Sequence, residues 1–184
     1  DWSPDSKSIW VEESCKTSRV VYTIPADGKS PEMITPERGV YSNPSFNQSG
    51  DLMAYIFEDA STPPQVMVIS LKDQQTQKVS SLNEDFAKMI HGKTEIISWK
   101  SKDGNYTIEG LVTWPGNFQK NRKYPLILNI HGGPAGVFNQ SYTGTGSLFP
   151  LQYFADQGYI ILRPNPRGSG GYGTDFRLAN KNDW

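Results

Sequence analysis

The stretch Tyr124-Pro125-Leu126-Ile127-Leu128-Asn129-Ile130-His131-Gly132-Gly133-Pro134 decides how the second half of this chain folds. Its continuous apolar run predicts a β-strand buried on both faces, as in a parallel sheet. Two glycines follow directly, and glycine reaches backbone angles that a Cβ opposes. The stretch therefore predicts a buried strand that ends in a loop able to present its backbone to a ligand.

The residues after this loop alternate between helix and strand patterns. Apolar side chains at helical spacing predict a helix over 147–157, with Pro150 near its start and Gly158 at its end. The apolar run 159–162 predicts a second buried strand, a glycine-rich loop follows over 163–173, and a last helix is expected from Thr174. Strand, helix and strand in this order are typical of an α/β sheet.

Upstream of the stretch, the pattern changes near residue 83. Apolar residues at helical spacing predict a short linker helix over 83–91. Strands are expected over 95–100 and 106–114, joined by the turn Lys102-Asp103-Gly104-Asn105.

The first half carries an internal repeat. The segment Trp2–Val11 aligns without gaps with Phe46–Tyr55, at an offset of 44 residues. A second pair of short β-rich runs, Val21–Ile24 and Val66–Ile69, lies at an offset of 45 residues. A period of about 40–45 residues with several strands per unit predicts β-propeller blades. Because closed propellers have about 4–8 blades, we expect further blades upstream of these two.

Composition excludes several classes of function. The 184 residues carry a net charge of −1, with no basic stripe for nucleic acid and no apolar run long enough to span a membrane. One cysteine, two histidines and the lack of HExxH or CxxC spacing argue against a metal site. No signal peptide is visible at Asp1, which leaves a cytoplasmic and a periplasmic location open.

The glycine-rich loop contains a dinucleotide-like pattern, Gly168-x-Gly170-x-x-Gly173. A nicotinamide site needs the first glycine at the strand-to-helix turn, and here Pro164 and Pro166 intervene. No cofactor is therefore expected.

Together, four motifs resemble the prolyl oligopeptidase family of serine peptidases, and its acylaminoacyl-peptidase and dipeptidyl-peptidase-like branch in particular. They are Lys123–Ile127, His131–Pro134, Gly158-Tyr159 and Asn165–Gly173, in that order. The resemblance implies two propeller blades over 1–82 and the N-terminal part of an α/β-hydrolase domain over 83–184. It further implies a peptide substrate, such as an acylaminoacyl peptide or an oligopeptide, cleaved by a Ser-His-Asp triad.

The same resemblance assigns roles to the two loops. Acyl transfer develops negative charge on a carbonyl oxygen, which fixed backbone N–H groups stabilise. Gly132 and Gly133 are expected to form the oxyanion-hole loop, with the donor at Gly133. The residues expected to support the loops are His131, Pro134, Arg167, Gly168 and Ser169. We interpret His131 as a brace for the loop and Arg167 as a partner for a carboxylate.

No G-x-S-x-G nucleophile elbow occurs in the 184 residues, so the triad is expected after residue 184, and the chain alone is predicted to be inactive. An internal triad of His91, Asp103 and Ser169 lacks any pattern that would bring its members together. Two alternatives stay open: a carboxylesterase or lipase with the same loop, and a non-catalytic propeller binding module. The expected partners are the rest of the polypeptide and, through an open sheet edge, other copies of the chain.

Overall fold

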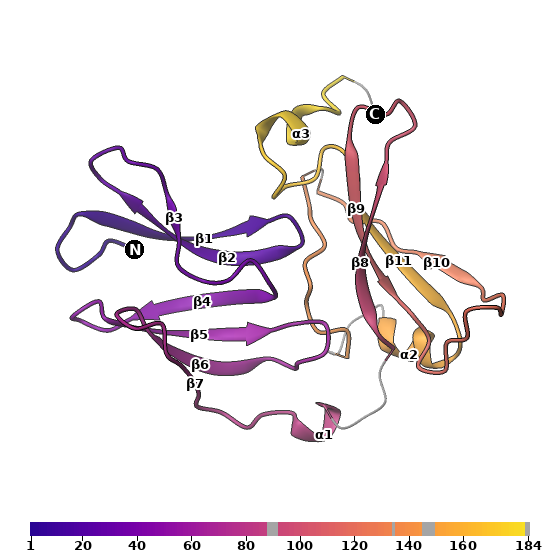
Figure 1. The fold of residues 1–184 in the computed structure, drawn as a ribbon, viewed down its shortest axis with the longest axis horizontal. Coiled ribbons are helices and arrows are strands. Elements are labelled where there is room, and N and C mark those ends of the chain that lie inside the picture. Colours follow the sequence, from indigo (N-terminus) through magenta and orange to yellow (C-terminus); the bar gives the residue numbers. More distant parts are fainter. Residues whose placement is uncertain (88–91, 134, 145–149, 183–184) are drawn as a thin grey trace.

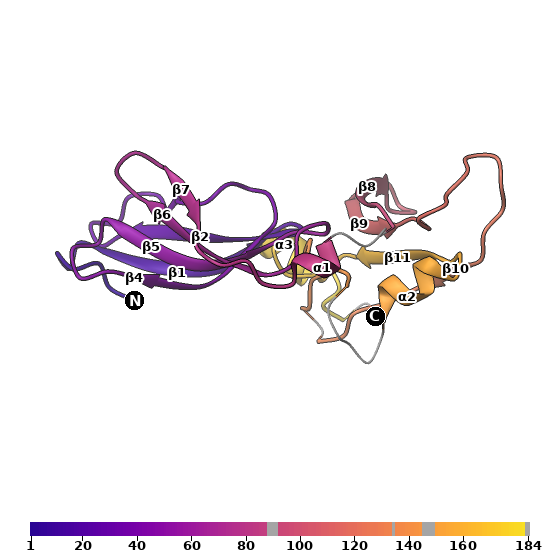
Figure 2. The same cartoon turned by 90° about the horizontal axis from the view of Figure 1, so that it is seen from below.

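The computed structural model describes residues 1–87, 92–133, 135–144 and 150–182, and most of its regular secondary structure is β-strand, arranged in two sheets (Figure 1). The two sheets lie side by side along the long axis of the molecule (Figures 1 and 2). The end of the predicted linker helix, the start of the helix predicted over 147–157, His91 and Pro134 lie outside the described residues.

The first sheet has the order β1-β2-β4-β5-β6-β7, with β3 paired to β2. Its strands are β1 (Ser8–Cys15), β2 (Ser18–Pro25), β3 (Glu32–Met33), β4 (Val40–Phe46), β5 (Leu52–Glu58), β6 (Gln65–Ser70) and β7 (Thr76–Lys78). The second sheet has the order β10-β11-β9-β8. Its strands are β8 (Thr94–Lys100), β9 (Thr107–Thr113), β10 (Leu126–Leu128) and β11 (Ile160–Asn165). Among the described residues, three short helices, α1 (Glu84–Ala87), α2 (Leu151–Asp156) and α3 (Thr174–Leu178), complete the elements.

The internal repeat is visible in the strand pairing. The antiparallel pair β1–β2 corresponds to the antiparallel pair β5–β6, and the short strand β3 corresponds to β7. The isolated bridge between Trp2 and Ile9 has its counterpart, 44 residues later, in the pair Phe46 and Met53. A single parallel bridge between Arg19 and Val40 joins the two units. The two units therefore share one strand pattern, and few backbone hydrogen bonds connect them.

Buried apolar side chains hold the first sheet together. Val21, Met53 and Ile69 are at most 4% exposed, and they pack with the rings of Tyr41 and Tyr55. These residues come from β2, β4, β5 and β6, so the core crosses the junction between the two repeated units. Each fully buried aliphatic side chain contributes about 1.5–3 kcal/mol through the hydrophobic effect.

The second sheet follows the predicted order of elements. The hairpin β8–β9 turns at Gly104, whose φ of +76° suits glycine. Strand β11 pairs parallel to β10 and antiparallel to β9. Helix α2 lies in the crossover between β10 and β11 and is followed by Gly158 with a φ of +89°, as expected for a helix C-terminus. The predicted last helix begins at Thr174.

The prediction that the strand within 124–130 is buried on both faces is wrong. Only Leu126–Leu128 form a strand, and the side chains of Leu126, Leu128 and Ile130 are 57%, 53% and 65% exposed. The reason is position, because β10 is the last strand of its sheet and pairs with β11 on one side. An apolar run indicates that a strand can be buried. Whether it is buried depends on the elements that pack against it, and the run itself does not show them.

Polar contacts join the two sheets. The Gln140 N–H donates to the Thr17 carbonyl at 2.8 Å, and the Tyr142 N–H donates to the Glu58 carboxylate at 2.9 Å. Burial raises the pKa of Glu58 above its ordinary value. No described helix has the length and apolar character needed to cross a membrane.

Candidate functional site

Two predicted loops meet because the strands that precede them are parallel. The carboxyl ends of β10 and β11 lie at the same edge of the sheet, which is where α/β proteins gather their functional loops. His131 follows β10, Ser169 follows β11, and the His131 Nε2 lies 3.0 Å from the Ser169 Oγ. The Gly170 N–H adds contacts of 3.3 Å to the carbonyls of Ala135 and Gly136. Residues 131–133, 135–136 and 166–170 therefore form one hydrogen-bonded unit.

The proton between Ser169 and His131 can be assigned from the partners of Ser169. Ser169 Oγ donates its single proton to the Pro166 carbonyl at 2.7 Å, so the His131 Nε2 is the donor to Ser169 Oγ. The other ring nitrogen, Nδ1, lies 3.2 Å from the Gly132 carbonyl oxygen. The side chain of Ser169 is 1% exposed, which leaves its hydroxyl no room to attack a substrate. This serine and histidine pair thus holds two loops together and differs from a nucleophile with its base.

The predicted oxyanion loop exposes its backbone. Gly132 and Gly133 are both exposed, and their N–H groups donate no hydrogen bond within the part of the chain that the structure describes. Gly133 has a φ of +129°, and a Cβ there would lie 2.9 Å from the Gly136 nitrogen. The Gly133 position therefore requires glycine and leaves an N–H group available to an acceptor.

The second loop is tied to helix α3. The Arg167 Nη1 donates to the Ala179 carbonyl at 2.9 Å, and the Gly168 N–H donates to the Phe176 carbonyl at 2.8 Å. Gly168 has a φ of +96°, and a Cβ there would collide with the side chain of Asn180. Arg167 and Gly168 thus fix the loop to α3, while a carboxylate partner for Arg167 stays a prediction.

Three residues in or beside the two loops, Gly136, Asn165 and Tyr172, were not singled out in the sequence. A Cβ on Gly136 would collide with the Gly132 carbonyl oxygen, so two loop segments touch there. Asn165 is fully buried and bonds both the N–H and the carbonyl of Phe138, at 2.7 and 3.0 Å, and its Nδ2 also donates to the Tyr172 hydroxyl. Asn165 and Tyr172 belong to the motif Asn165–Gly173. Their side-chain amide and phenol could have been predicted from the sequence to form hydrogen bonds that hold the loop.

The rejected internal triad finds no support. The Asp103 carboxylate accepts hydrogen bonds from Ser101 and Asn105 within the β8–β9 turn, and these hydrogen bonds hold its pKa below the ordinary value. Ser169 contacts His131, and His91 lies outside the described residues.

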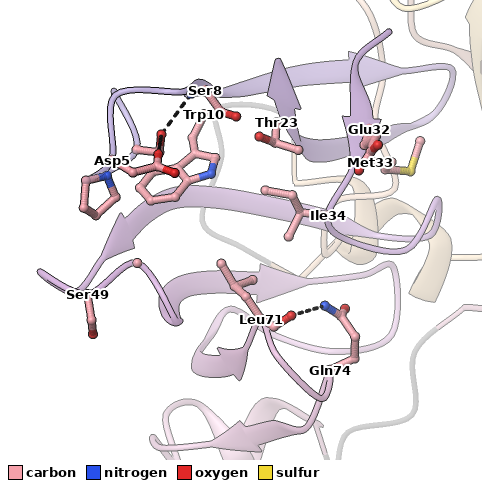
Figure 3. Close-up of a pocket in the computed structure, with 13 residues that line it drawn as sticks. Asp5, Ser8, Trp10, Thr23, Glu32, Met33, Ile34, Ser49, Leu71 and Gln74 are labelled. Atoms are coloured by element: carbon pink, nitrogen blue, oxygen red, sulfur yellow. Dashed lines mark hydrogen bonds between the residues drawn. The ribbon is translucent and has the colours of Figure 1, made fainter. Parts of the chain in front are cut away.

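A cavity of about 530 Å³ opens elsewhere, between the two repeated units of the first sheet (Figure 3). Trp10 and Thr23 line it from β1 and β2, and Leu71 and Gln74 line it from the β6–β7 turn. None of its lining residues belongs to the two loops, so the cavity is separate from the candidate site.

Comparisons with known proteins bear on the whole chain. A model of the prolyl oligopeptidase family matches residues 147–184. The chain is 31% identical to dipeptidyl-peptidase 5 of Aspergillus fumigatus over 194 aligned residues, which cover all of this chain and 25% of that protein. The probable dipeptidyl-peptidase 5 of Trichophyton verrucosum is 27% identical over all of this chain and 25% of its own length. The chain thus spans about a quarter of the length of these relatives.

Solved structures share the fold. An acylaminoacyl peptidase of Pyrococcus horikoshii superposes on 94% of this chain and 26% of its own, with a TM-score of 0.76 and 22% identity. A dipeptidyl peptidase 4 of Porphyromonas gingivalis covers 94% of this chain and 25% of its own, with a TM-score of 0.73 and 19% identity. The family model and the curated relatives confirm the resemblance to the prolyl oligopeptidase family that the four motifs predicted.

Proposed function

We propose that this chain supplies the oxyanion-hole loop of a serine peptidase, with the Gly133 N–H as the donor. One observation carries the proposal: Gly133 is exposed, and its N–H donates no hydrogen bond to any residue that the structure describes, in a loop that the contact between His131 and Ser169 fixes in place. A donor held in this way needs no reorganisation when charge develops on the substrate, and one such donor contributes about 3 kcal/mol to catalysis.

The proposed reaction is acyl transfer to a serine that the 184 residues do not contain. The serine Oγ attacks the peptide carbonyl, the carbonyl oxygen becomes an oxyanion, and the Gly133 N–H stabilises it. No G-x-S-x-G occurs in the sequence, so the nucleophile and its aspartate and histidine come from the remainder of a longer polypeptide. His131 holds its Nε2 proton toward Ser169, which suits a brace rather than a general base.

The proposed architecture has two parts. Residues 1–82 form two blades of an incomplete β-propeller, supported by the matched strand pairs and by the bridge that recurs after 44 residues. Residues 83–184 form the first part of an α/β-hydrolase domain, supported by the parallel pair β10–β11 and the crossover helix α2.

The proposed substrates are short peptides, from which the enzyme releases dipeptides or acylated amino acids. The names of the relatives support peptide cleavage, since they are dipeptidyl and acylaminoacyl peptidases. A carboxylesterase or lipase with the same loop is the second candidate, and the repeated strand units upstream argue for the peptidase. A binding role without catalysis is the third, and the exposed Gly133 N–H argues against it.

The test compares the chain with the longer polypeptide that the proposal requires. We expect residues 1–184 to hydrolyse neither a dipeptidyl nitroanilide, nor an acetyl-amino-acid nitroanilide, nor p-nitrophenyl butyrate. The longer polypeptide is expected to cleave the nitroanilides, and Gly133→Ala is expected to lower its kcat about 100-fold, because the side chain displaces the donor. Gly104→Ala is the matched control, since it replaces another glycine of positive φ, in the turn between β8 and β9 rather than in the loops after β10 and β11.

Three outcomes would contradict the proposal. Turnover by residues 1–184 would place the chemistry within this chain. A strong preference for the butyrate ester would favour the esterase. Equal losses for Gly133→Ala and Gly104→Ala would show that the loop glycine acts only on stability.

A further inference from the structure

Strand β11 carries an arginine inside the molecule. Arg163 pairs directly with Leu111 of β9, so their side chains share one face of the sheet with Ile161 and Asn165. Arg163 is 5% exposed, and Leu111 and Ile161 are fully buried. Arg163 therefore stands on this face beside two buried apolar side chains. Glu109, whose carboxylate accepts from the Tyr172 hydroxyl, pairs with Asn165 at the end of the same face.

The guanidinium lacks the partners that such a place requires. Its Nε and Nη2 are buried and have no hydrogen-bond partner among the residues that the structure describes. Burial lowers the pKa of Arg163 to about 10, and burial is the sole cause of the shift, so the group is charged at neutral pH and no neighbouring carboxylate acts on it. The ring of Phe138, 5.8 Å from the guanidinium carbon, is its aromatic neighbour.

One cation–π contact does not offset the burial of a whole charge. Buried N–H groups are nearly always bonded in folded proteins, so an unbonded pair points to a group that is not among the described residues. Asn165, two residues further along the same face, has all of its polar atoms bonded. The lack of partners is thus particular to Arg163.

The two unbonded donors specify the chemistry of that group. The Nε–H and Nη2–H lie on the same edge of the planar guanidinium and match the two oxygens of a carboxylate. A single negative charge balances the one positive charge at this buried position, whereas a phosphate would bring more charge than Arg163 neutralises. A halide ion has one acceptor atom and cannot place a separate acceptor in front of each N–H, as a carboxylate does.

The position links this edge to the candidate site. The Phe138 ring contacts the His131 ring edge to face, with 5.2 Å between the centroids, and also lies next to the Arg163 guanidinium. We propose that Arg163 is a carboxylate-binding residue, whose Nε and Nη2 edge takes a carboxylate from outside the described residues and thereby fixes Phe138 beside His131. This proposal does not depend on the peptidase assignment.

The carboxylate has two sources that experiment separates: a free carboxylate, such as a peptide C-terminus, and an acidic side chain of a longer polypeptide. Sodium acetate is the probe for the first source, titrated against sodium chloride at equal ionic strength. We expect acetate to shift the Arg163 Nε–H resonance and to raise the Tm of residues 1–184 by a few degrees. Arg163→Met is expected to abolish the Tm shift, and Arg163→Lys, which lacks the two-pronged edge, to reduce it.

The control is Arg122→Met, because Arg122 also lies near an aromatic ring but is exposed. This variant is expected to keep the full acetate response. If acetate has no effect, the side-chain source predicts opposite signs: Arg163→Met raises the Tm of residues 1–184 and lowers that of the longer polypeptide. The proposal is overturned if acetate and chloride act alike and Arg163→Met changes both proteins in the same direction.

Discussion

The two sheets differ in how far along the chain their strands find partners. In the first sheet, neighbouring strands are nearly always consecutive, from β1–β2 to β6–β7. In the second, β11 separates β10 from β9, although it follows both in sequence. The first sheet closes a core around Met53 and Tyr55, whereas the second leaves Leu126 and Leu128 exposed at its edge.

This difference explains where the candidate site lies. Consecutive antiparallel strands need only tight turns, and they produce a repeated scaffold. A parallel pair needs a crossover, and it brings the ends of two strands, and the loops after them, to one edge. The candidate site lies on the sheet that has the crossover, where His131 and Ser169 are 38 residues apart in sequence.

The largest expected effect tests whether the two sheets unfold separately. Met53→Ala and Leu111→Ala each remove a fully buried side chain, one from each sheet, at a cost of about 2–5 kcal/mol. Because the contacts between the sheets include polar bonds such as that of Gln140 to Thr17, we expect each substitution to loosen its own sheet. Hydrogen exchange read by mass spectrometry is the measurement.

Met53→Ala should speed exchange in β4–β6 and leave β8–β9 protected, and Leu111→Ala should do the reverse. Equal loss of protection in both sheets for either variant would show that the two sheets form one cooperative unit. The difference in strand pairing would then not correspond to separate unfolding of the sheets.

A smaller effect is expected within the loop of the candidate site. Gly136→Ala places a Cβ against the Gly132 carbonyl oxygen and 2.9 Å from the His131 Nδ1, so the loop must shift, at a cost of about 2 kcal/mol. Gly132→Ala is the matched control, because a Cβ there meets nothing within 4 Å, and its cost is expected to be below about 0.5 kcal/mol. Urea denaturation compares the two, and similar midpoints would mean that the loop is not closely packed.

The hairpins and the order of elements follow from local signals, and those predictions succeeded. The turn at Gly104, the helix end at Gly158 and the start of α3 at Thr174 each depend on a few neighbouring residues. The 44-residue repeat was also visible, because the same turn and strand pattern occurs twice in the sequence.

What the sequence could not show depends on distant partners. The exposure of Leu126 follows from the place of β10 at the sheet edge. The Nε and Nη2 of Arg163 have no hydrogen-bond partner among the described residues, which only the packing against Arg163 reveals. The contact of Ser169 with His131 needed the parallel register of β10 and β11. Site residues were therefore predictable as loop members, but their pairing was not.

The smallest expected effect concerns the junction between the sheets. The folded state raises the pKa of Glu58 through burial, so between its ordinary and raised values the folded protein binds more protons than the unfolded one. Stability contributed by Glu58 is therefore full below the ordinary pKa and is lost as pH rises through the raised one. Glu58→Gln keeps an acceptor for the Tyr142 N–H and removes the charge.

The Glu58→Gln variant is expected to have a slightly higher Tm than the unaltered chain at pH 7, which corresponds to a gain in stability of no more than about 0.5 kcal/mol. Near pH 4 the two Tm values are expected to match. Thermal melts at both pH values provide the check. A Tm of Glu58→Gln that falls at pH 7 would show that the charge stabilises the junction, through Arg19 for example.

The central claim is that His131 and Ser169 lock two loops into one site, with the histidine as the donor. Its most direct test is the nitrogen NMR spectrum of His131 in residues 1–184, with and without Ser169→Ala. We predict a protonated Nε2 in the unaltered chain, a clear change of the Nε2 resonance in Ser169→Ala, and a destabilisation of about 1–2 kcal/mol. An Nε2 without a proton in the unaltered chain, or a resonance that Ser169→Ala leaves unchanged, would contradict the claim.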